Sequence, residues 1–248
     1  MKLKKPKLKI FCDFDGTIVK NDIWNHSLGK FIHDKEKFAE IGEQFAKCQI
    51  TGRQCIKSEL SLIEGFTFEE FDKLLDEEEL DDNFRSFLAF CDEKDYEFII
   101  ISEGLDYYID FILNKFSINV RRYCNHLVAT PNDKGYSDLT CEFPYDDENC
   151  NVCGMSKRNI LLMNTNDYEN EVSVLIGDGV SDYCVSNYAD IVFAKKELAS
   201  YCWKNNITYF EYKTFDDVRK KLIKSEETHK LKHRQTAKFN RKDVFLGG

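Results

Sequence analysis

The sequence predicts an α/β fold in which a doubly wound parallel sheet carries a small helical cap inserted after its first strand. Apolar runs at residues 8–13, 96–102 and 172–176 have the length and composition of buried strands, and helical patterns separate them. The first and last of these runs deliver aspartates. Residues 22–80 show only helical periodicity, which indicates a separate helical unit.

Length and composition allow one sizeable domain and a smaller unit. The chain has 248 residues, of which 42% are hydrophobic and only 3 are Pro. No apolar run approaches a membrane span, and none behind the basic N-terminus is long enough for a signal peptide. We therefore expect a cytoplasmic protein with no membrane partner, present as a monomer or a homodimer.

The net charge of −9 is unevenly distributed along the chain. Residues 1–10 carry five Lys and no acidic residue, and residues 228–248 carry six Lys or Arg against one Asp. The acidic body between them argues against nucleic acid as a partner. We interpret the basic ends as solvated tails, and rising polarity beyond residue 224 predicts a frayed or extended segment.

Residues 11–19, with the sequence FCDFDGTIV, place two carboxylates at the end of the first predicted strand. Asp13 and Asp15 lie two residues apart, and such residues point to the same side of a strand. Gly16 permits a tight turn, and Thr17 adds a hydroxyl. A divalent cation would offset the repulsion between the two acids. The alternative is a solvated turn after an edge strand.

The insert that follows reads as about four helices. Because it comes directly after the first strand, it should lie over the carboxyl ends of the strands, where open α/β sheets bind ligands. The acidic run at residues 76–82 is interpreted as a solvated face. We assign residues 1–20 and 81–227 to the core domain, residues 21–80 to the helical cap, and residues 228–248 to a basic C-terminal tail.

The remaining elements alternate between helix and strand, as a parallel doubly wound sheet requires. The strands after residue 80 are expected at 96–102, 123–129, 172–176 and 191–194, with a β excursion at 136–143. The helices are expected at 82–95, 105–116, 156–164, 181–188, 198–204 and 214–223.

Polar residues also follow the later strands. Residues 172–182, with the sequence VSVLIGDGVSD, deliver Asp178 at a strand end and Asp182 four residues later. Two strand ends that each supply carboxylates fit one metal site better than two unrelated turns. Ser102 ends the middle strand, and Lys157 begins a helix. Taken singly, Ser102 would be a helix cap and Lys157 a surface lysine.

These four motifs, in this order and spacing, resemble those of haloacid-dehalogenase-type phosphatases over about residues 7–222. The resemblance implies a Rossmann-like core with a cap, and Mg²⁺-dependent hydrolysis of a small phosphorylated metabolite. It implies that Asp13 is the nucleophile that forms an aspartyl-phosphate, and that Asp15 is the general acid and base. The residues it implies as metal ligands are Asp13, Asp15 through its backbone carbonyl, Asp178, and Asp182 as a ligand or a neighbour of one.

The same resemblance assigns phosphate and substrate contacts. Phosphoryl oxygens would be held by Thr17, Ser102, Lys157 and the backbone amides of Glu103 and Gly104. Asp22 stands where the phosphoserine phosphatase branch has a Glu that contacts the substrate's amino group. Because Asp is one methylene shorter, a phosphoserine substrate is less well supported.

Other stretches are similar to the branch that contains the methionine-salvage phosphatase for 2-hydroxy-3-keto-5-methylthiopentenyl-1-phosphate. They include residues 123–126, 143–144, 150–157 and 190–195, and related fungal polyol-phosphate phosphatases share the last block. The expected substrate is therefore a sugar- or polyol-type phosphate or a methylthio-ketopentenyl phosphate.

Several alternatives remain open from the sequence. Phosphoserine hydrolysis, phosphoryl transfer to an acceptor and carbon–halogen cleavage use the same scaffold, although dehalogenases of the family lack the second Asp that stands here at Asp15. A different class would be a non-catalytic binding protein that uses its basic termini on nucleic acid or membrane.

The chain has 10 Cys, which without a secretion signal indicates reduced thiols or metal ligands rather than disulfides. Cys150 and Cys153 have the spacing of zinc ligands, with Cys124, Cys141 or His126 as possible partners. A pair of free thiols and a redox-sensitive pair are the alternatives. The cysteines interpreted as small core residues are Cys12, Cys91, Cys124, Cys184 and Cys202.

Overall fold

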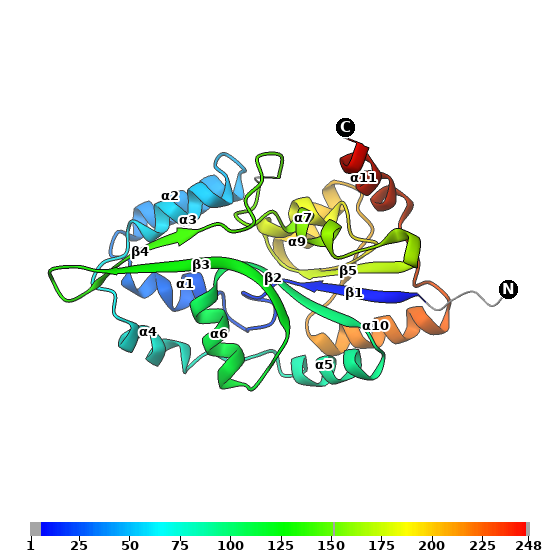
Figure 1. Ribbon diagram of the computed structural model, residues 1–248, viewed down its shortest axis with the longest axis horizontal. Helices are drawn as coiled ribbons and strands as arrows, with labels where there is room; N and C mark the ends of the chain where they lie inside the picture. The colour runs from blue at the N-terminus through cyan, green and yellow to red at the C-terminus, as the bar shows by residue number, and fades with distance from the viewer. Residues whose placement is uncertain (1–5, 151, 247–248) are drawn as a thin grey trace.

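A seven-stranded, mostly parallel sheet forms the centre of the protein, in a computed structural model that describes residues 6–150 and 152–246 (Figure 1). Its strand order is β4-β3-β2-β1-β5-β6-β7, and only the β3–β4 pair is antiparallel. The α/β prediction is therefore confirmed. The strands are β1 Lys7–Cys12, β2 Glu97–Leu105, β3 Arg121–Pro131, β4 Ser137–Glu142, β5 Glu171–Gly177, β6 Ile191–Ala194 and β7 Phe210–Glu211.

Helices cover both faces of this sheet, which explains why the central strands carry apolar residues on both sides. Along β1, Ile10 and Cys12 pack on the side of α5, α6 and α10, while Phe11 packs on the side of α7, α8 and α9. The core helices are α5 Phe84–Glu93, α6 Asp106–Lys115, α7 Lys157–Met163, α8 Tyr183–Ser186, α9 Lys196–Lys204, α10 Phe215–Glu227 and α11 Gln235–Leu246, with 3₁₀ turns η2 Asp167–Glu169 and η3 Val180–Asp182.

The insert after β1 is helical, as expected, and lies beyond the carboxyl end of that strand (Figure 1). The long β3–β4 hairpin reaches the insert, where the Ser137 backbone N–H donates to the Phe66 carbonyl at 3.0 Å. The elements of the insert are α1 Ile23–His26, η1 Leu28–Phe31, α2 Lys35–Ala46, α3 Gly52–Leu60 and α4 Phe68–Leu75.

The acidic run that ends the insert is not simply a solvated face, and that interpretation is wrong at Glu78. This side chain is 1% exposed and accepts hydrogen bonds from Ser27 Oγ at 2.6 Å and Asn21 Nδ2 at 3.0 Å. His26 Nδ1 lies 2.7 Å from Glu78 Oε1. Glu78 therefore ties the return of the insert to its beginning, a pairing between residues about fifty positions apart that a local charge pattern does not reveal.

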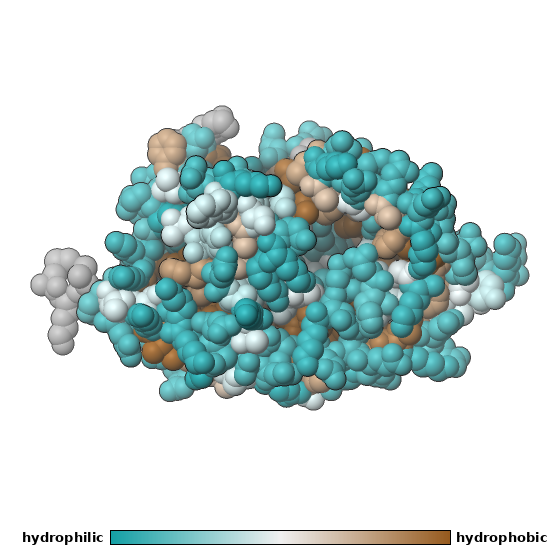
Figure 2. Space-filling model, turned by 180° about the vertical axis from the view of Figure 1, so that it is seen from behind, coloured by the Kyte–Doolittle hydropathy of each residue, from teal (hydrophilic) through white to brown (hydrophobic). Residues whose placement is uncertain are grey.

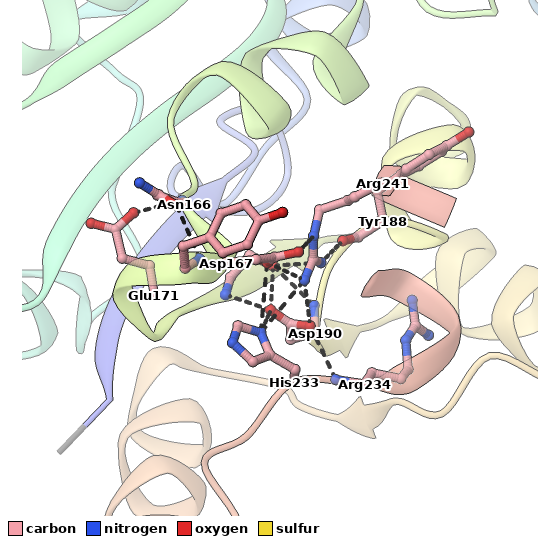
Figure 3. Close-up of polar contacts among 10 residues, drawn as sticks. Asn166, Asp167, Glu171, Tyr188, Asp190, His233, Arg234 and Arg241 are labelled. Atoms are coloured by element: carbon pink, nitrogen blue, oxygen red, sulfur yellow. Dashed lines mark hydrogen bonds and ion pairs between the residues drawn. The ribbon is translucent and has the colours of Figure 1, made fainter. Parts of the chain in front are cut away.

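The prediction of a frayed segment beyond residue 224 is also wrong. Helix α10 continues to Glu227, and α11 docks against the core (Figure 1). Arg241, which is 3% exposed, donates to Asp167 Oδ1 at 2.7 Å and Asp190 Oδ1 at 3.0 Å (Figure 3). His233 Nδ1 lies 3.2 Å from Asp190 Oδ2. Arg241 is thus buried and His233 half-buried, because their acidic partners lie on earlier loops, while Lys230, Lys232 and Lys242 are exposed.

Within the described residues, no helix is long and apolar enough to cross a membrane.

Candidate active site

A cavity of about 680 Å³ lies where the insert meets the carboxyl ends of the strands. Figure 2 shows the surface hollowed between the two parts, with hydrophobic side chains in the recess. The core side of its lining includes Asp13, Asp15, Ser102, Glu103, Gly104, Tyr108, Asp178, Ser181 and Lys196. The insert contributes Asp22, Trp24, Asn25, Phe38, Phe45, Gly52, Cys55, Ile56 and Glu59.

Asp13 follows β1 directly and is held by Lys157. The Lys157 ammonium is fully buried at the start of α7 and lies 2.7 Å from Asp13 Oδ1, 2.8 Å from Asp182 Oδ1 and 2.9 Å from Ser181 Oγ. Burial disfavours its charge, but Asp13, Asp182 and Glu103 more than offset this and raise the pKa of Lys157. The Lys157 ammonium group therefore fixes one oxygen of Asp13.

Asp178 approaches the same point from the end of β5. Its Oδ2 accepts a hydrogen bond from Lys196 Nζ at 2.7 Å. Gly16 lies against this pair with φ +64°, and a Cβ atom there would come within 2.7 Å of Asp178 Oδ2. The glycine is thus required both by the turn and by the close approach of Asp178.

Three of the carboxylates predicted as metal ligands converge. Oxygen atoms of Asp13, Asp178 and Asp182 all lie within 4.8 Å of one another, and all three residues are buried. Burial and the two neighbouring carboxylates raise the pKa of Asp13 against the opposing effect of Lys157. Such a crowded set of hard oxygen donors fits a divalent cation such as Mg²⁺, because the cation would remove the repulsion.

Asp182 differs from the other two members of this group. Its Oδ1 accepts a hydrogen bond from Lys157 Nζ at 2.8 Å, and its Oδ2 accepts one from the Asp178 backbone N–H at 3.1 Å. Its side chain has no exposed surface. Both oxygens are therefore already engaged in holding Lys157 and the β5 loop, an arrangement suited to positioning the ligands.

Asp15 lies at the entrance to the insert with partners on both sides. Its Oδ1 accepts the Ile23 backbone N–H at 3.1 Å, and its Oδ2 accepts the Tyr108 hydroxyl at 2.7 Å. Burial, followed by the negative charge of Asp22, raises the pKa of Asp15 to about 7, although the Tyr108 hydrogen bond opposes this. A carboxyl group with that pKa can both donate and accept a proton near neutral pH.

The end of β2 supplies groups for an anion. Ser102 Oγ accepts the Gly104 backbone N–H at 2.9 Å and lies 3.5 Å from Asp15 Oδ2. The Glu103 backbone carbonyl is held by Asn125 Nδ2 at 2.7 Å. The Glu103 side chain accepts the Gly154 N–H and has its pKa raised by burial to about 7.

Two predicted substrate residues lie farther from this centre. Thr17 is 1% exposed and lies outside the cavity lining. Asp22 lines the cavity but also caps α1, where its carboxylate accepts the Asn25 N–H at 3.1 Å.

The sequence interpretation missed several residues of the site. Tyr108 lies within the helix expected at residues 105–116, where its spacing is that of a core residue, but its hydroxyl reaches Asp15. Lys196 and Ser181 follow the strand ends and could have been found from that position. Glu59 and Trp24 belong to the helical pattern of the insert, and no local signal distinguishes them.

The cysteine expectations are met only in part. Cys150 and Cys153 are both buried, and neither belongs to a candidate group of metal ligands among the described residues. Cys184 is half-buried rather than a core residue, and it shares a hydrogen bond with Cys150 that lowers the pKa of the Cys150 thiol to about 6. The other four cysteines expected in the core are buried.

Comparison with known proteins agrees with this geometry. A protein named 2-hydroxy-3-keto-5-methylthiopentenyl-1-phosphate phosphatase from Bacillus cereus (strain AH187) is 31% identical over 228 residues, covering 87% of this chain and 95% of that protein. A protein of the same name from Bacillus cereus (strain G9842) is 28% identical over 218 residues, with the same coverage of both chains.

Solved structures support the fold. A phosphoserine phosphatase that carries a phospho-aspartyl intermediate analogue superposes with a TM-score of 0.65 at 20% identity, covering 85% of this chain and 95% of that one. The sequence profile of haloacid dehalogenase-like hydrolases matches residues 10–186. The chain therefore belongs to the haloacid dehalogenase-like hydrolase family, as a phosphoric monoester hydrolase.

Proposed function

We propose that the protein is an Mg²⁺-dependent phosphatase that hydrolyses a small sugar- or polyol-type phosphate, or a methylthio-ketopentenyl phosphate, through an aspartyl-phosphate at Asp13. The observation that carries the proposal is the arrangement of Asp13, Lys157 and Asp178 at the core end of the cavity between the insert and the sheet, with Asp15 beside them. Asp13 and Asp178 would hold the Mg²⁺ ion together with the Asp15 carbonyl, and Asp182 would position them.

In the first step, Asp13 would attack the phosphorus atom while Asp15 gives its proton to the leaving oxygen. Lys157 would hold Asp13 Oδ1, so that the other carboxylate oxygen faces the phosphoryl group. Ser102 and the backbone N–H groups of Glu103 and Gly104 would bind phosphoryl oxygens. The bound metal supplies positive charge that lets an anionic nucleophile approach an anionic phosphate.

In the second step, Asp15 would accept a proton from water that attacks the aspartyl-phosphate. The hydroxyl of Tyr108 and the Ile23 N–H hold both Asp15 oxygens in place, so the same carboxyl group remains in reach of both steps. Because Ile23 begins α1, this hydrogen bond links the position of Asp15 to the start of the insert.

Support for the substrate class comes from the relatives and from the cavity. The two Bacillus proteins are named for a five-carbon ketone phosphate with a methylthio group, which has no charge beyond the phosphate. The insert side of the cavity offers Trp24, Phe38, Phe45 and Ile56 to such a carbon chain. The enclosing insert disfavours phosphoproteins as substrates, and rapid turnover of a folded phosphoprotein would contradict this part of the proposal.

The decisive experiment measures phosphate release from a panel of small phosphomonoesters with Mg²⁺ and with EDTA. We expect metal-dependent release that Asp13→Asn abolishes, while the matched exposed variant Asp133→Asn behaves as wild type. No release from any panel member by folded protein would overturn the proposal. Product analysis with an added alcohol acceptor would separate hydrolysis from the runner-up function, phosphoryl transfer.

A further inference from the structure

One buried carboxyl group in the cavity has no role in the two chemical steps. Glu59, on α3, is 6% exposed and lines the cavity on the insert side, far along the chain from the motif aspartates. The indole Nε1–H of Trp24 donates a hydrogen bond to Glu59 Oε2. The Cys55 thiol also bonds this carboxyl group. Because a carboxylate offers about four lone-pair sites, these partners leave Glu59 able to accept a further hydrogen bond.

The charged side chains around Glu59 on the insert side of the cavity are all acidic. Of the described residues that line the cavity, Lys196 is the only Lys or Arg, and it is paired with Asp178 at the core end. The insert side contributes the acids Asp22 and Glu59 and no cation. Burial raises the pKa of Glu59 to about 7, and the negative charges of Asp22 and Glu103 act in the same direction.

A leaving group that enters this region loses its hydration shell and comes close to the carboxyl groups of Glu59 and Asp22. A carboxylate there would be desolvated opposite Glu59 and Asp22 without a cation to pair with. A hydroxyl, by contrast, can donate to Glu59 while the carbon chain packs on Phe38, Phe45 and Ile56.

We propose that Glu59 determines the substrate class of this phosphatase: it accepts a hydrogen bond from a hydroxyl of an uncharged leaving group and rejects leaving groups that carry a carboxylate. This inference rests on the proposed function and narrows it. It favours the polyol-type and ketopentenyl phosphates over phosphoserine, whose leaving group carries a carboxylate.

A matched pair of probes tests the selection. Glycerol 1-phosphate and 3-phosphoglycerate share a carbon skeleton and differ in a terminal CH₂OH against a carboxylate. In an assay at pH 8, above the pKa of Glu59, we expect wild-type kcat/KM for glycerol 1-phosphate to be higher by about 100-fold, since a site with buried polar groups discriminates strongly when they are left unmatched. Glu59→Gln should cut this ratio to about one tenth or less, largely through a gain on 3-phosphoglycerate.

Two further variants show whether the charge of Glu59 or a general effect of substitution changes the preference between the probes. Glu59→Asp keeps the charge but withdraws it by one methylene, so it should retain the rejection of 3-phosphoglycerate while losing rate on glycerol 1-phosphate. Glu43→Gln, an exposed glutamate on α2 outside the cavity lining, should leave the ratio unchanged. Equal use of the two probes by wild type, or an unchanged ratio in folded Glu59→Gln, would overturn the assignment.

Failure of the proposed function can be distinguished from failure of this inference. If wild type releases phosphate from neither probe nor from p-nitrophenyl phosphate, the proposed hydrolysis is wrong. Calorimetric titration of wild type with each probe then still measures selection without turnover. Tighter binding of glycerol 1-phosphate that Glu59→Gln removes would support the role of Glu59, and equal affinities would contradict it.

Discussion

Two adjacent tyrosines on α6 make the same contact for different purposes. The Tyr108 hydroxyl donates to Asp15 Oδ2 at 2.7 Å inside the cavity, and the Tyr107 hydroxyl donates to Asp72 Oδ1 at 2.7 Å outside the cavity lining. Identical chemistry thus serves the candidate acid and base in one case and the packing of α4 on α6 in the other.

We expect Tyr108→Phe to lower kcat by about 10- to 100-fold with a much smaller change in KM. Loss of a hydrogen bond to a charged group removes about 1.5–3 kcal/mol of interaction and frees Asp15 to rotate. Steady-state kinetics on the preferred phosphomonoester measures this, with Tyr107→Phe as the control that keeps kcat within a factor of about two. Equal losses in the two variants would show that Tyr108 acts only through packing.

Glu59 should make stability depend on pH. Its carboxyl has a pKa of about 7 in the folded protein and an ordinary value of 4.5, so the folded state holds a proton that the unfolded state releases between these values. The free energy of unfolding therefore falls as pH rises from 4.5 to 7, by about 1–3 kcal/mol from this group. Above pH 7 both states are ionised and the loss is complete.

Glu59→Gln should remove that part of the decline. Urea unfolding of wild type and variant at intervals from pH 4.5 to 7.5, with EDTA present, measures the difference. Parallel curves for the two proteins would mean that Glu59 ionises normally in the fold.

At the scale of elements, Arg241 makes most of the polar contacts that hold α11 on the core. Arg241 joins Asp167 and Asp190, and the Asp190 side chain has no exposed surface (Figure 3). Ser173 Oγ also donates to Asp190 Oδ2 at 3.0 Å, so the carboxylate is embedded in a network. Removal of one partner from a buried ion pair costs about 3–5 kcal/mol, because the remaining charge stays buried.

We therefore expect Arg241→Ala to lower the free energy of unfolding by about 3 kcal/mol and to expose residues 228–234 to protease. The neighbouring Lys242 is exposed, and Lys242→Ala should change neither quantity. Urea denaturation and limited proteolysis provide the measurements. Wild-type resistance of Arg241→Ala to protease would mean that the other contacts of α11 are sufficient to hold it.

The insert is joined to the core through Gly52 at the start of α3. Its backbone N–H donates to the Val152 carbonyl at 3.0 Å, and a Cβ atom at Gly52 would lie 2.6 Å from the Gly154 nitrogen. No side chain fits there without moving α3 away from the loop that precedes Lys157.

Gly52→Ala should lower kcat/KM by about tenfold or more, because the overpacking costs about 1–3 kcal/mol and displaces the insert side of the cavity. Kinetics and thermal unfolding of this variant are compared with Ser58→Ala on the same helix, which should stay near wild type. Wild-type rates for Gly52→Ala would show that the insert tolerates displacement.

For the whole molecule, the cluster of buried carboxylates predicts that a bound metal ion stabilises the folded state. Asp13, Asp178 and Asp182 converge from β1 and the loop after β5, so a cation bound among them would tie both segments together. Saturation at 100 times the dissociation constant adds about 2.7 kcal/mol to the free energy of unfolding.

Mg²⁺ should therefore raise the melting temperature relative to EDTA, and Asp178→Asn should remove most of that increase. Thermal unfolding across a Mg²⁺ series measures the effect, with Asp133→Asn as the control. An identical Mg²⁺ response in wild type and Asp178→Asn would place the ion elsewhere.

Local pattern was sufficient for much of this molecule. The apolar runs around Phe11 and Leu175 predict buried strands, because both faces of a parallel sheet are covered. The acids after each run predict convergence, because the carboxyl ends of parallel strands share one edge. Asp13 and Asp178 were found in this way, and the structure brings oxygen atoms of the two within 4.8 Å of each other. Lys157 was assigned only through the family resemblance, and its ammonium lies 2.7 Å from Asp13 Oδ1.

Only the tertiary structure decided the remaining contacts. Arg241 is indistinguishable in sequence from a solvated tail residue, Tyr108 from a core aromatic, and Glu59 from a helix-surface acid. Each acquires its role from a partner on another element, and no periodicity records that partner. Apolar periodicity and the positions of the acids are enough to predict the sheet and the order of its motifs, because both depend on residues that are close in the sequence. Which polar side chains are buried together depends instead on the packing of segments that are far apart in the sequence.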